Sequence, residues 1–299
     1  MKFILEGLFT VFIGFLSFWV VEDFPDDATF LKPLEKHVVL MRLKSDGQAS
    51  HRYETFKWKY FWAAFKDWKT WAGMLMYMGV DGSLYAFSLF LPSVINELGY
   101  TATKAQLLTV PPYALACVMV LSLYITLNQT CVVGFAADRT GRRGVFNISF
   151  ALIGCGGFAM LVASRNPHVS YAGTFLGAIG IYPCISNTIT WVGNNVEGVY
   201  KRGVSLGAVI AWGNLNGVMS SNIYRGKDAP WYRLGHSVVL GYLAVCLLGG
   251  SIMNYTFLAI GNKRRANATE ESRRKKLDGL SEEEQQHLAD FHPDFRYTL

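Results

Sequence analysis

The residue with the clearest chemical potential is an aspartate inside an apolar stretch. Asp81 interrupts an apolar run that covers positions 70–91. An ionisable side chain in such a run is costly and is by default a candidate functional group. Tyr77, Tyr85 and Ser88 recur around it at helical spacing, so one face of the expected helix is polar. This face could line a cavity and pass a proton or bind a substrate cation. Alternatively, Asp81 could be a structural aspartate satisfied inside a helix bundle.

Two further apolar runs carry polar side chains. Four candidates gather toward the end of the run at 170–192: Asn187, Trp191, Asn194 and Asn195. Asparagine and tryptophan can orient a small polar solute by hydrogen bonding and stacking, but polar residues in membranes also hold helices together. In the run at 203–224, Asn214 lies between Gly213 and Gly217. That GxxxG spacing favours close helix packing, which a rocking transporter would also use.

A short basic turn separates two long charge-free runs. Positions 105–137 and 144–164 contain no charged residue. The turn between them holds one acid and three bases: Asp138, Arg139, Arg142 and Arg143. Lys and Arg concentrate in the short cytoplasmic loops of membrane proteins. The turn is therefore expected on the cytoplasmic side, and it fixes the orientation of the other spans.

The apolar runs predict an all-α integral membrane protein with about seven transmembrane helices. A helix needs about 20 predominantly apolar residues to cross a bilayer. The expected spans cover positions 7–21, 70–91, part of 105–137, 144–163, 170–192, 203–224 and 236–260. The first could instead be a signal peptide. However, only Lys2 is basic before it, Glu6 is acidic, and no small-residue cleavage site follows.

The basic residues between the spans orient the chain. Four connections hold nine, three, two and eight Lys and Arg, respectively: 22–69, 138–143, 193–202 and the tail from 263. The other three connections hold one, one and three Lys and Arg, respectively: those near 93–104, 165–169 and 225–235. The first set is therefore expected in the cytoplasm, with Met1 outside. The predicted organisation is a transmembrane helix at 1–21, a cytoplasmic central loop at 22–69, a six-helix half at 70–262 and a cytoplasmic tail at 263–299.

Local patterns add detail to the two longest polar segments. Positions 34–44 suit a short helix, although a solvated linker is an open alternative for the first half of the central loop. Aromatic residues at 56–62 are typical of an interfacial helix that leads into the bilayer. The tail is expected to be a short helix followed by a disordered end.

The composition excludes several classes of protein. Hydrophobic residues make up 51% and charged residues 17% of the chain, against about 25% charged residues in ordinary soluble domains, and the mean hydropathy is +0.22. The net charge of +6 is spread over loops and tail rather than one face, so we expect no nucleic-acid partner. The five cysteines lie in apolar runs without CxxC or a nearby histidine pair, which argues against a metal site or a disulfide frame.

Common site motifs give no further candidate. We find no P-loop or HExxH motif, and therefore expect neither an enzyme nor a bound cofactor. Four N-x-S/T matches fall in apolar runs or in the expected cytoplasmic tail and are not credible glycan sites: Asn128, Asn147, Asn254 and Asn267.

Several motifs match a known family over nearly the whole chain. They are EDFPDDATFL at 22–31, YAFSLFLP at 85–92, LLTVPPY at 107–113, ADR at 137–139, WVGNN at 191–195 and HPDFRY at 292–297. With these motifs the chain resembles a major facilitator superfamily transporter, and more narrowly the fungal allantoate permease family of anion:cation symporters.

The resemblance implies a twelve-helix fold of which this chain supplies helices six to twelve. That is a partial major-facilitator-type fold, with the last helix of the N-terminal half followed by the six-helix C-terminal half. It implies uptake of a small organic anion such as allantoate, ureidosuccinate, nicotinate, pantothenate or biotin across the plasma membrane, with a proton as the coupling ion. Asp81 would face the cavity, with Tyr85, Asn187, Trp191 and Asn214 nearby. The turn at 138–143 matches the superfamily's conformational latch, which is not a substrate site.

Two departures from the family pattern leave alternatives open. The first five helices are missing, so half of a cavity between two halves would be absent. Residues near 122–130 look inserted, because the charge-free run overshoots a bilayer of about 30 Å at about 1.5 Å per residue. A mis-translated intron would explain them, and transcript reads that all retain these codons would refute it. The chain could also be an inactive membrane fragment or a half-transporter that needs a separate N-terminal half. A membrane enzyme or a seven-helix receptor explains the basic turn less well.

Overall fold

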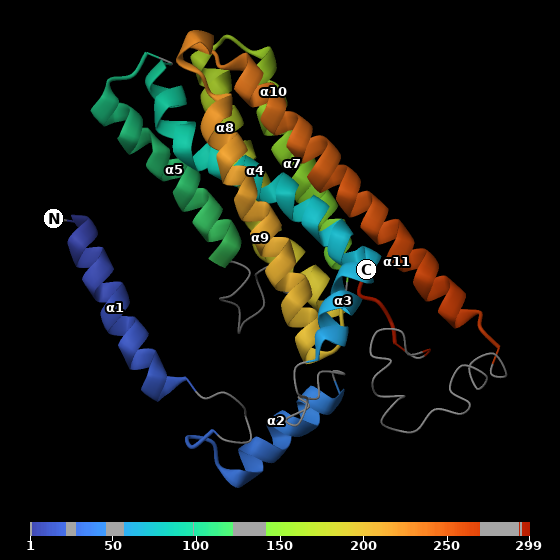
Figure 1. Cartoon of the computed structure of the whole chain (residues 1–299). Coiled ribbons are helices and arrows are strands. Elements are labelled where there is room, and N and C mark those ends of the chain that lie inside the picture. The colour runs from blue at the N-terminus through green and yellow to red at the C-terminus, as the bar shows by residue number, and fades with distance from the viewer. Residues whose placement is uncertain are drawn as a thin grey trace. The chain divides into compact units, whose positions relative to one another are not determined.

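The structure is a computed structural model that describes residues 2–21, 28–45, 57–97, 99–121, 142–269, 293 and 295–299. The chain divides into two compact units, Met1–Phe56 and Lys57–Leu299. The first unit contains α1 and α2, and the second contains the long helices and the last residues of the chain (Figure 1).

α1 (Lys2–Val20) coincides with the first expected span. Its described side chains are all exposed in the structure, and most of them are apolar. A helix that is apolar on all sides suits surroundings of lipid or of other apolar helices. This is the environment that a membrane span requires.

α2 (Pro33–Ser45) confirms the short helix expected at 34–44. Proline occupies its first position, where the missing N–H would lack a partner in any case. The main-chain N–H of Lys32 donates to Glu35 Oε2 over 2.9 Å. This bond is one half of a capping box and marks where the helix begins.

The helices of the second unit form a bundle, and most of them are long (Figure 1). In chain order they are α3 (Trp58–Lys66), α4 (Trp68–Glu97), α5 (Ala102–Leu121), α7 (Arg143–Ala163), α8 (Pro167–Asn195), α9 (Val199–Ile223), α10 (Arg233–Gly241) and α11 (Gly250–Ala266). A π-helical segment, Tyr242–Gly249, joins α10 to α11, so Arg233–Ala266 forms one helix of 34 residues.

The helices lie where the apolar runs predicted spans. In the described part of the chain, four helices are long and apolar enough to cross a membrane by length and composition: Trp68–Glu97, Arg143–Ala163, Pro167–Asn195 and Arg233–Ala266. α5 and α9 occupy two further expected spans. The suspected insertion at 122–130 and the rest of that charge-free run up to position 137 lie outside the described residues.

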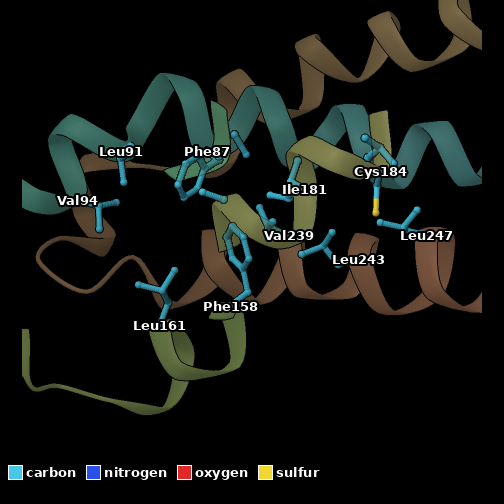
Figure 2. Close-up of a cluster of buried hydrophobic side chains, with 14 of the residues drawn as sticks. Phe87, Leu91, Val94, Phe158, Leu161, Ile181, Cys184, Val239, Leu243 and Leu247 are labelled. Atoms are coloured by element: carbon cyan, nitrogen blue, oxygen red, sulfur yellow. The ribbon is translucent and has the colours of Figure 1, made fainter. Parts of the chain in front are cut away.

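The bundle core is made by apolar side chains from α4, α7, α8 and the last helix (Figure 2). Phe87, Phe158, Ile181 and Leu243 meet there, and each is at most 4% exposed. Lipid tails are as apolar as leucine, so van der Waals packing rather than escape from water holds such a core together.

Glycines bring α7 and α8 into close contact. A Cβ atom added to Gly180 would lie 2.3 Å from the Cα atom of Gly154, and one added to Gly157 would lie 2.5 Å from the main-chain nitrogen of Gly177. Contacts this short leave no room for any side chain. The two helices therefore approach backbone to backbone, as small-residue motifs in membranes allow.

α3 is a short helix with an aromatic outer face. Trp58 and Trp62 are 67% and 59% exposed, whereas Ala64 is buried. The ring of Tyr60 stacks on that of Tyr200, with centroids 6.1 Å apart. α3 therefore packs with the second unit, although the sequence assigned its residues to the central loop. Its placement at the membrane surface stays a prediction.

The final residues of the chain correct one expectation. α11 continues to Ala266, and residues 295–299 lie against the bundle rather than forming a disordered end. The expectation of disorder was wrong for these five residues because it rested on polar composition. It could not foresee the particular bonds that hold them. Residues 270–292 of the tail lie outside the described part of the chain, so the short helix expected for the tail stays a prediction there.

Candidate functional site

A polar stripe on α4 faces a small-residue face on α9. Tyr77, Asp81 and Tyr85 follow one another at intervals of four residues and thus share a helix face. A Cβ atom on Gly213 would lie 2.3 Å from Tyr77 Cδ1 and 3.2 Å from Asp81 Oδ2. One on Gly217 would lie 3.7 Å from the Tyr85 ring. The glycines of α9 therefore make room for the polar stripe.

Asp81 is buried and incompletely partnered. Its side chain is 4% exposed, and its Oδ2 atom has no hydrogen-bond partner among the described residues. A buried polar atom without a partner costs free energy. Carboxyl groups in membrane spans are kept where they handle ions, protons or substrates. This oxygen is the most direct sign of function in the described bundle.

Hydrogen bonds connect the neighbouring stripe residues to two other helices. Tyr85 Oη donates to Asn214 Oδ1 of α9 over 2.7 Å, and Ser88 Oγ lies 3.2 Å from Tyr182 Oη of α8. Asn214 is exposed in this structure, unlike Asp81. The stripe thus runs from a buried carboxyl to an accessible amide, a course suited to passing a proton or holding a polar solute.

The other candidates from α8 have different partners. Asn187 Nδ2 donates to the main-chain oxygen of Arg143 over 2.9 Å. Trp191 Nε1 and Asn195 Nδ2 both donate to the main-chain oxygen of Thr298, over 2.9 and 3.0 Å. Asn194 is half-buried. The structure therefore divides the predicted residues between the α4–α9 stripe and a second network that includes the tail.

Asn147 is the centre of that second network, although it was not among the candidate site residues. It is fully buried, donates to Ser251 Oγ over 2.8 Å, and accepts from Asn187 and Thr188 over 3.2 and 3.3 Å. These bonds join α7, α8 and α11. The only signals in the sequence at this position are an amide inside a charge-free run and a glycosylation match.

A buried ion cluster ties the start of α4 to α9. Asp67 Oδ2 lies 2.9 Å from Lys69 Nζ and 2.7 Å from Lys201 Nζ, and its Oδ1 caps the helix by accepting from the Lys69 N–H over 3.0 Å. Burial alone would raise the pKa of Asp67, but the two ammonium groups outweigh it and lower the pKa below its ordinary value. Asp67 therefore stays ionised at neutral pH and acts as a structural anchor.

The predicted latch is described only in part. Arg142 is the residue before α7 and Arg143 is its first residue. Asp138 and Arg139 lie outside the described residues. The role of all four as a conformational latch stays a prediction.

Closely packed apolar helices around a buried carboxyl are typical of a polytopic membrane protein. Comparison with known proteins identifies the class. The sequence model of the Major Facilitator Superfamily matches residues 2–221. The chain belongs to this superfamily, which consists of transporters and not of enzymes, and it is an integral membrane protein.

Its relatives are fungal transporters. The chain is 34% identical over 282 residues to an uncharacterized transporter of Schizosaccharomyces pombe, covering 93% of this chain and 55% of the relative. It is 28% identical over 298 residues to the high-affinity nicotinic acid transporter of Saccharomyces cerevisiae, covering 99% of this chain and 52% of the relative. The chain thus spans about half the length of the curated relatives it matches.

Proposed function

We propose that the chain supplies the last helix of the N-terminal half and the six-helix C-terminal half of a proton-coupled symporter for a small organic anion. Nicotinate is the first candidate substrate, because one relative is a nicotinic acid transporter. Allantoate and pantothenate follow from the resemblance to the allantoate permease family. The expected location is the plasma membrane, with the tail in the cytoplasm. The observation that carries the proposal is the buried, unpartnered Oδ2 atom of Asp81.

Electrostatics explain how one carboxyl would couple a proton to an anion. Two like charges about 4 Å apart repel by about 4 kcal/mol at an effective dielectric constant of about 20. An anionic substrate therefore binds poorly beside ionised Asp81. Protonation removes this repulsion, and the departing anion favours release of the proton. Substrate and proton thus move together in one direction.

The surrounding residues fit supporting roles. Tyr77, Tyr85, Ser88 and Asn214 would offer hydroxyl and amide groups along the pathway. Asn187, Trp191 and Asn195, also candidates from the sequence, bond to α7 and the tail and so fit helix-holding roles better. Asn194 remains a candidate for the pathway. The turn at 138–143 would serve as the cytoplasmic latch.

Substrate sites in such transporters lie between two repeats near the bilayer midplane. The described helices of this chain would therefore line one side of the site, and residues of an N-terminal half would line the other.

Uptake of radiolabelled nicotinate by yeast cells that lack their own nicotinic acid transporter tests the proposal. The chain is expressed alone and together with the N-terminal half of the Saccharomyces cerevisiae relative. We expect accumulation that rises as the external pH falls and disappears with a protonophore. Accumulation only in the paired cells identifies a half-transporter. If surface-expressed protein accumulates none of nicotinate, allantoate and pantothenate in either arrangement, the proposal is wrong.

A further inference from the structure

The last five residues of the sequence occupy a built site at one end of the bundle. α7 begins at this end, and α8 and α11 end there. Asn195 of α8 brackets Thr298: its Oδ1 accepts from the Thr298 N–H over 2.9 Å, and its Nδ2 donates to the Thr298 carbonyl over 3.0 Å. Trp191, which is fully buried, donates to the same carbonyl.

Asn262 of α11 brackets the preceding residue in the same way. Its Oδ1 accepts from the Tyr297 N–H over 2.9 Å, and its Nδ2 donates to the Tyr297 carbonyl over 2.8 Å. Two asparagines on different helices thus each satisfy both main-chain groups of one tail residue. An extended peptide at the edge of a β-sheet has its main-chain N–H and C=O groups paired in the same way. Here amide side chains take the place of the neighbouring strand.

One aromatic side chain anchors the segment. The guanidinium carbon of Arg265 lies 4.2 Å from the centre of the Tyr297 ring, and Arg265 Nη2 donates to Tyr297 Oη over 2.7 Å. Lys69 Nζ lies 5.2 Å from the same ring centre. Both distances suit cation–π attraction. A Cβ atom on Gly261 would lie 3.1 Å from the ring, so glycine leaves space for it.

The segment also reaches the first turn of α7. The Gly144 N–H, which has no partner within its own helix, donates to the main-chain oxygen of Leu299 over 3.1 Å. Gly144 lies directly after Arg142 and Arg143, the described part of the predicted latch turn. The tail therefore connects α8 and α11 to the helix that begins at this turn.

We propose that Phe295–Leu299 is a releasable clamp, a peptide ligand carried by the chain itself that ties the start of α7 to the ends of α8 and α11. Hydrogen bonds supply most of its contacts, and each contributes only modestly in net terms. The segment follows α11 after a connection of 28 residues, 267–294. Tethering gives a ligand an effective concentration in the millimolar range. A weakly binding peptide can therefore stay docked and still be displaced.

Hydrogen–deuterium exchange on the whole detergent-purified chain tests the clamp. We expect protection of the Tyr297, Thr298 and Gly144 amides. Tyr297→Ala removes the aromatic anchor and changes no residue of the bundle helices, so it should speed exchange about tenfold at Thr298 and also at Gly144. The matched control is Arg296→Ala, whose exposed side chain reaches the Asn262 main-chain oxygen at 3.5 Å. It should leave both amides unchanged.

A synthetic peptide tests whether the clamp is releasable. Excess Phe-Arg-Tyr-Thr-Leu should speed exchange of the chain's own tail while Gly144 stays protected, and a scrambled peptide should do neither. The clamp is refuted if the tail amides of the unmodified chain are unprotected, or if Tyr297→Ala leaves the exchange rate at Gly144 unchanged. If the peptide does not displace the tail, the clamp is not releasable. None of these readouts depends on transport, so they stand or fall separately from the proposed function.

Discussion

Replacing Asp81 with asparagine is expected to abolish proton-driven accumulation while leaving substrate exchange intact. Asparagine has nearly the same shape as a protonated aspartate, but it has no proton to release. The substrate could still bind and cross, because the repulsive charge is permanently absent. Coupling between two ligands is commonly worth about 5- to 150-fold, so accumulation should fall about tenfold or more. The measurement compares concentrative uptake with counterflow in cells that express the chain and an N-terminal half.

The matched control is Glu97→Gln. Glu97 is an exposed carboxylate at the end of the same helix, α4. The substitution makes the same chemical change outside the polar stripe, so uptake should stay near its normal value. Equal accumulation by Asp81→Asn and the unmodified chain would remove Asp81 from the mechanism.

The second large effect is expected from Gly180→Ala in α8. The added Cβ atom would lie 2.3 Å from the Cα and nitrogen atoms of Gly154. Both are backbone atoms, so α7 and α8 would have to move apart. Overpacking of this kind costs about 1–3 kcal/mol, occasionally more, and we expect the upper end. Thermal unfolding of the purified protein, monitored by size-exclusion chromatography, measures the loss of stability as a lower melting temperature.

Gly156→Ala on α7 is the control for this effect. A Cβ atom at Gly156 would meet nothing within 4 Å. Alanine is the better helix former by roughly 0.5–1 kcal/mol in a helix interior, so this variant should be as stable as the unmodified chain or slightly more stable. If both variants have the same melting temperature, the close contact of α7 and α8 is not what stabilises the bundle.

The helices could be predicted because a membrane span is recognised from one continuous apolar stretch of the sequence. Charge-free runs such as 144–163 need no tertiary information to be recognised, and α7 occupies Arg143–Ala163. The ends of the spans were less predictable. α4 and α8 extend beyond the runs at 70–91 and 170–192, and each begins at a capping side chain, Asp67 or Asn166, that lies before its apolar run.

The sequence predicted the residues of the polar stripe on α4 but not their partners on other helices. A carboxyl in an apolar run identified Asp81, and helical spacing gave it Tyr77 and Tyr85. The sequence did not show that Gly213 lies against Asp81 or that Asn214 bonds Tyr85. These contacts join helices far apart in the chain, and their register depends on packing.

The second network was predicted least well. Asn147 and Thr298 have no distinctive sequence surroundings, and their importance comes only from partners on other helices. Their hydrogen-bonding groups made Trp191 and Asn195 candidates, and in the structure these groups bind the tail. A single sequence shows which groups could form hydrogen bonds but not which partners they find.

Cysteine accessibility on the two sides of α9 tests most directly whether this chain is threaded through a bilayer as described. α9 carries Asn214, which accepts the hydrogen bond from Tyr85 of the polar stripe. Val199→Cys and Lys227→Cys place one exposed thiol just inside its start and one beyond its end. We expect a membrane-impermeant maleimide to label Lys227→Cys on intact cells, and Val199→Cys only after permeabilisation. Labelling of both thiols from the same side would contradict the membrane topology on which the proposed transport depends.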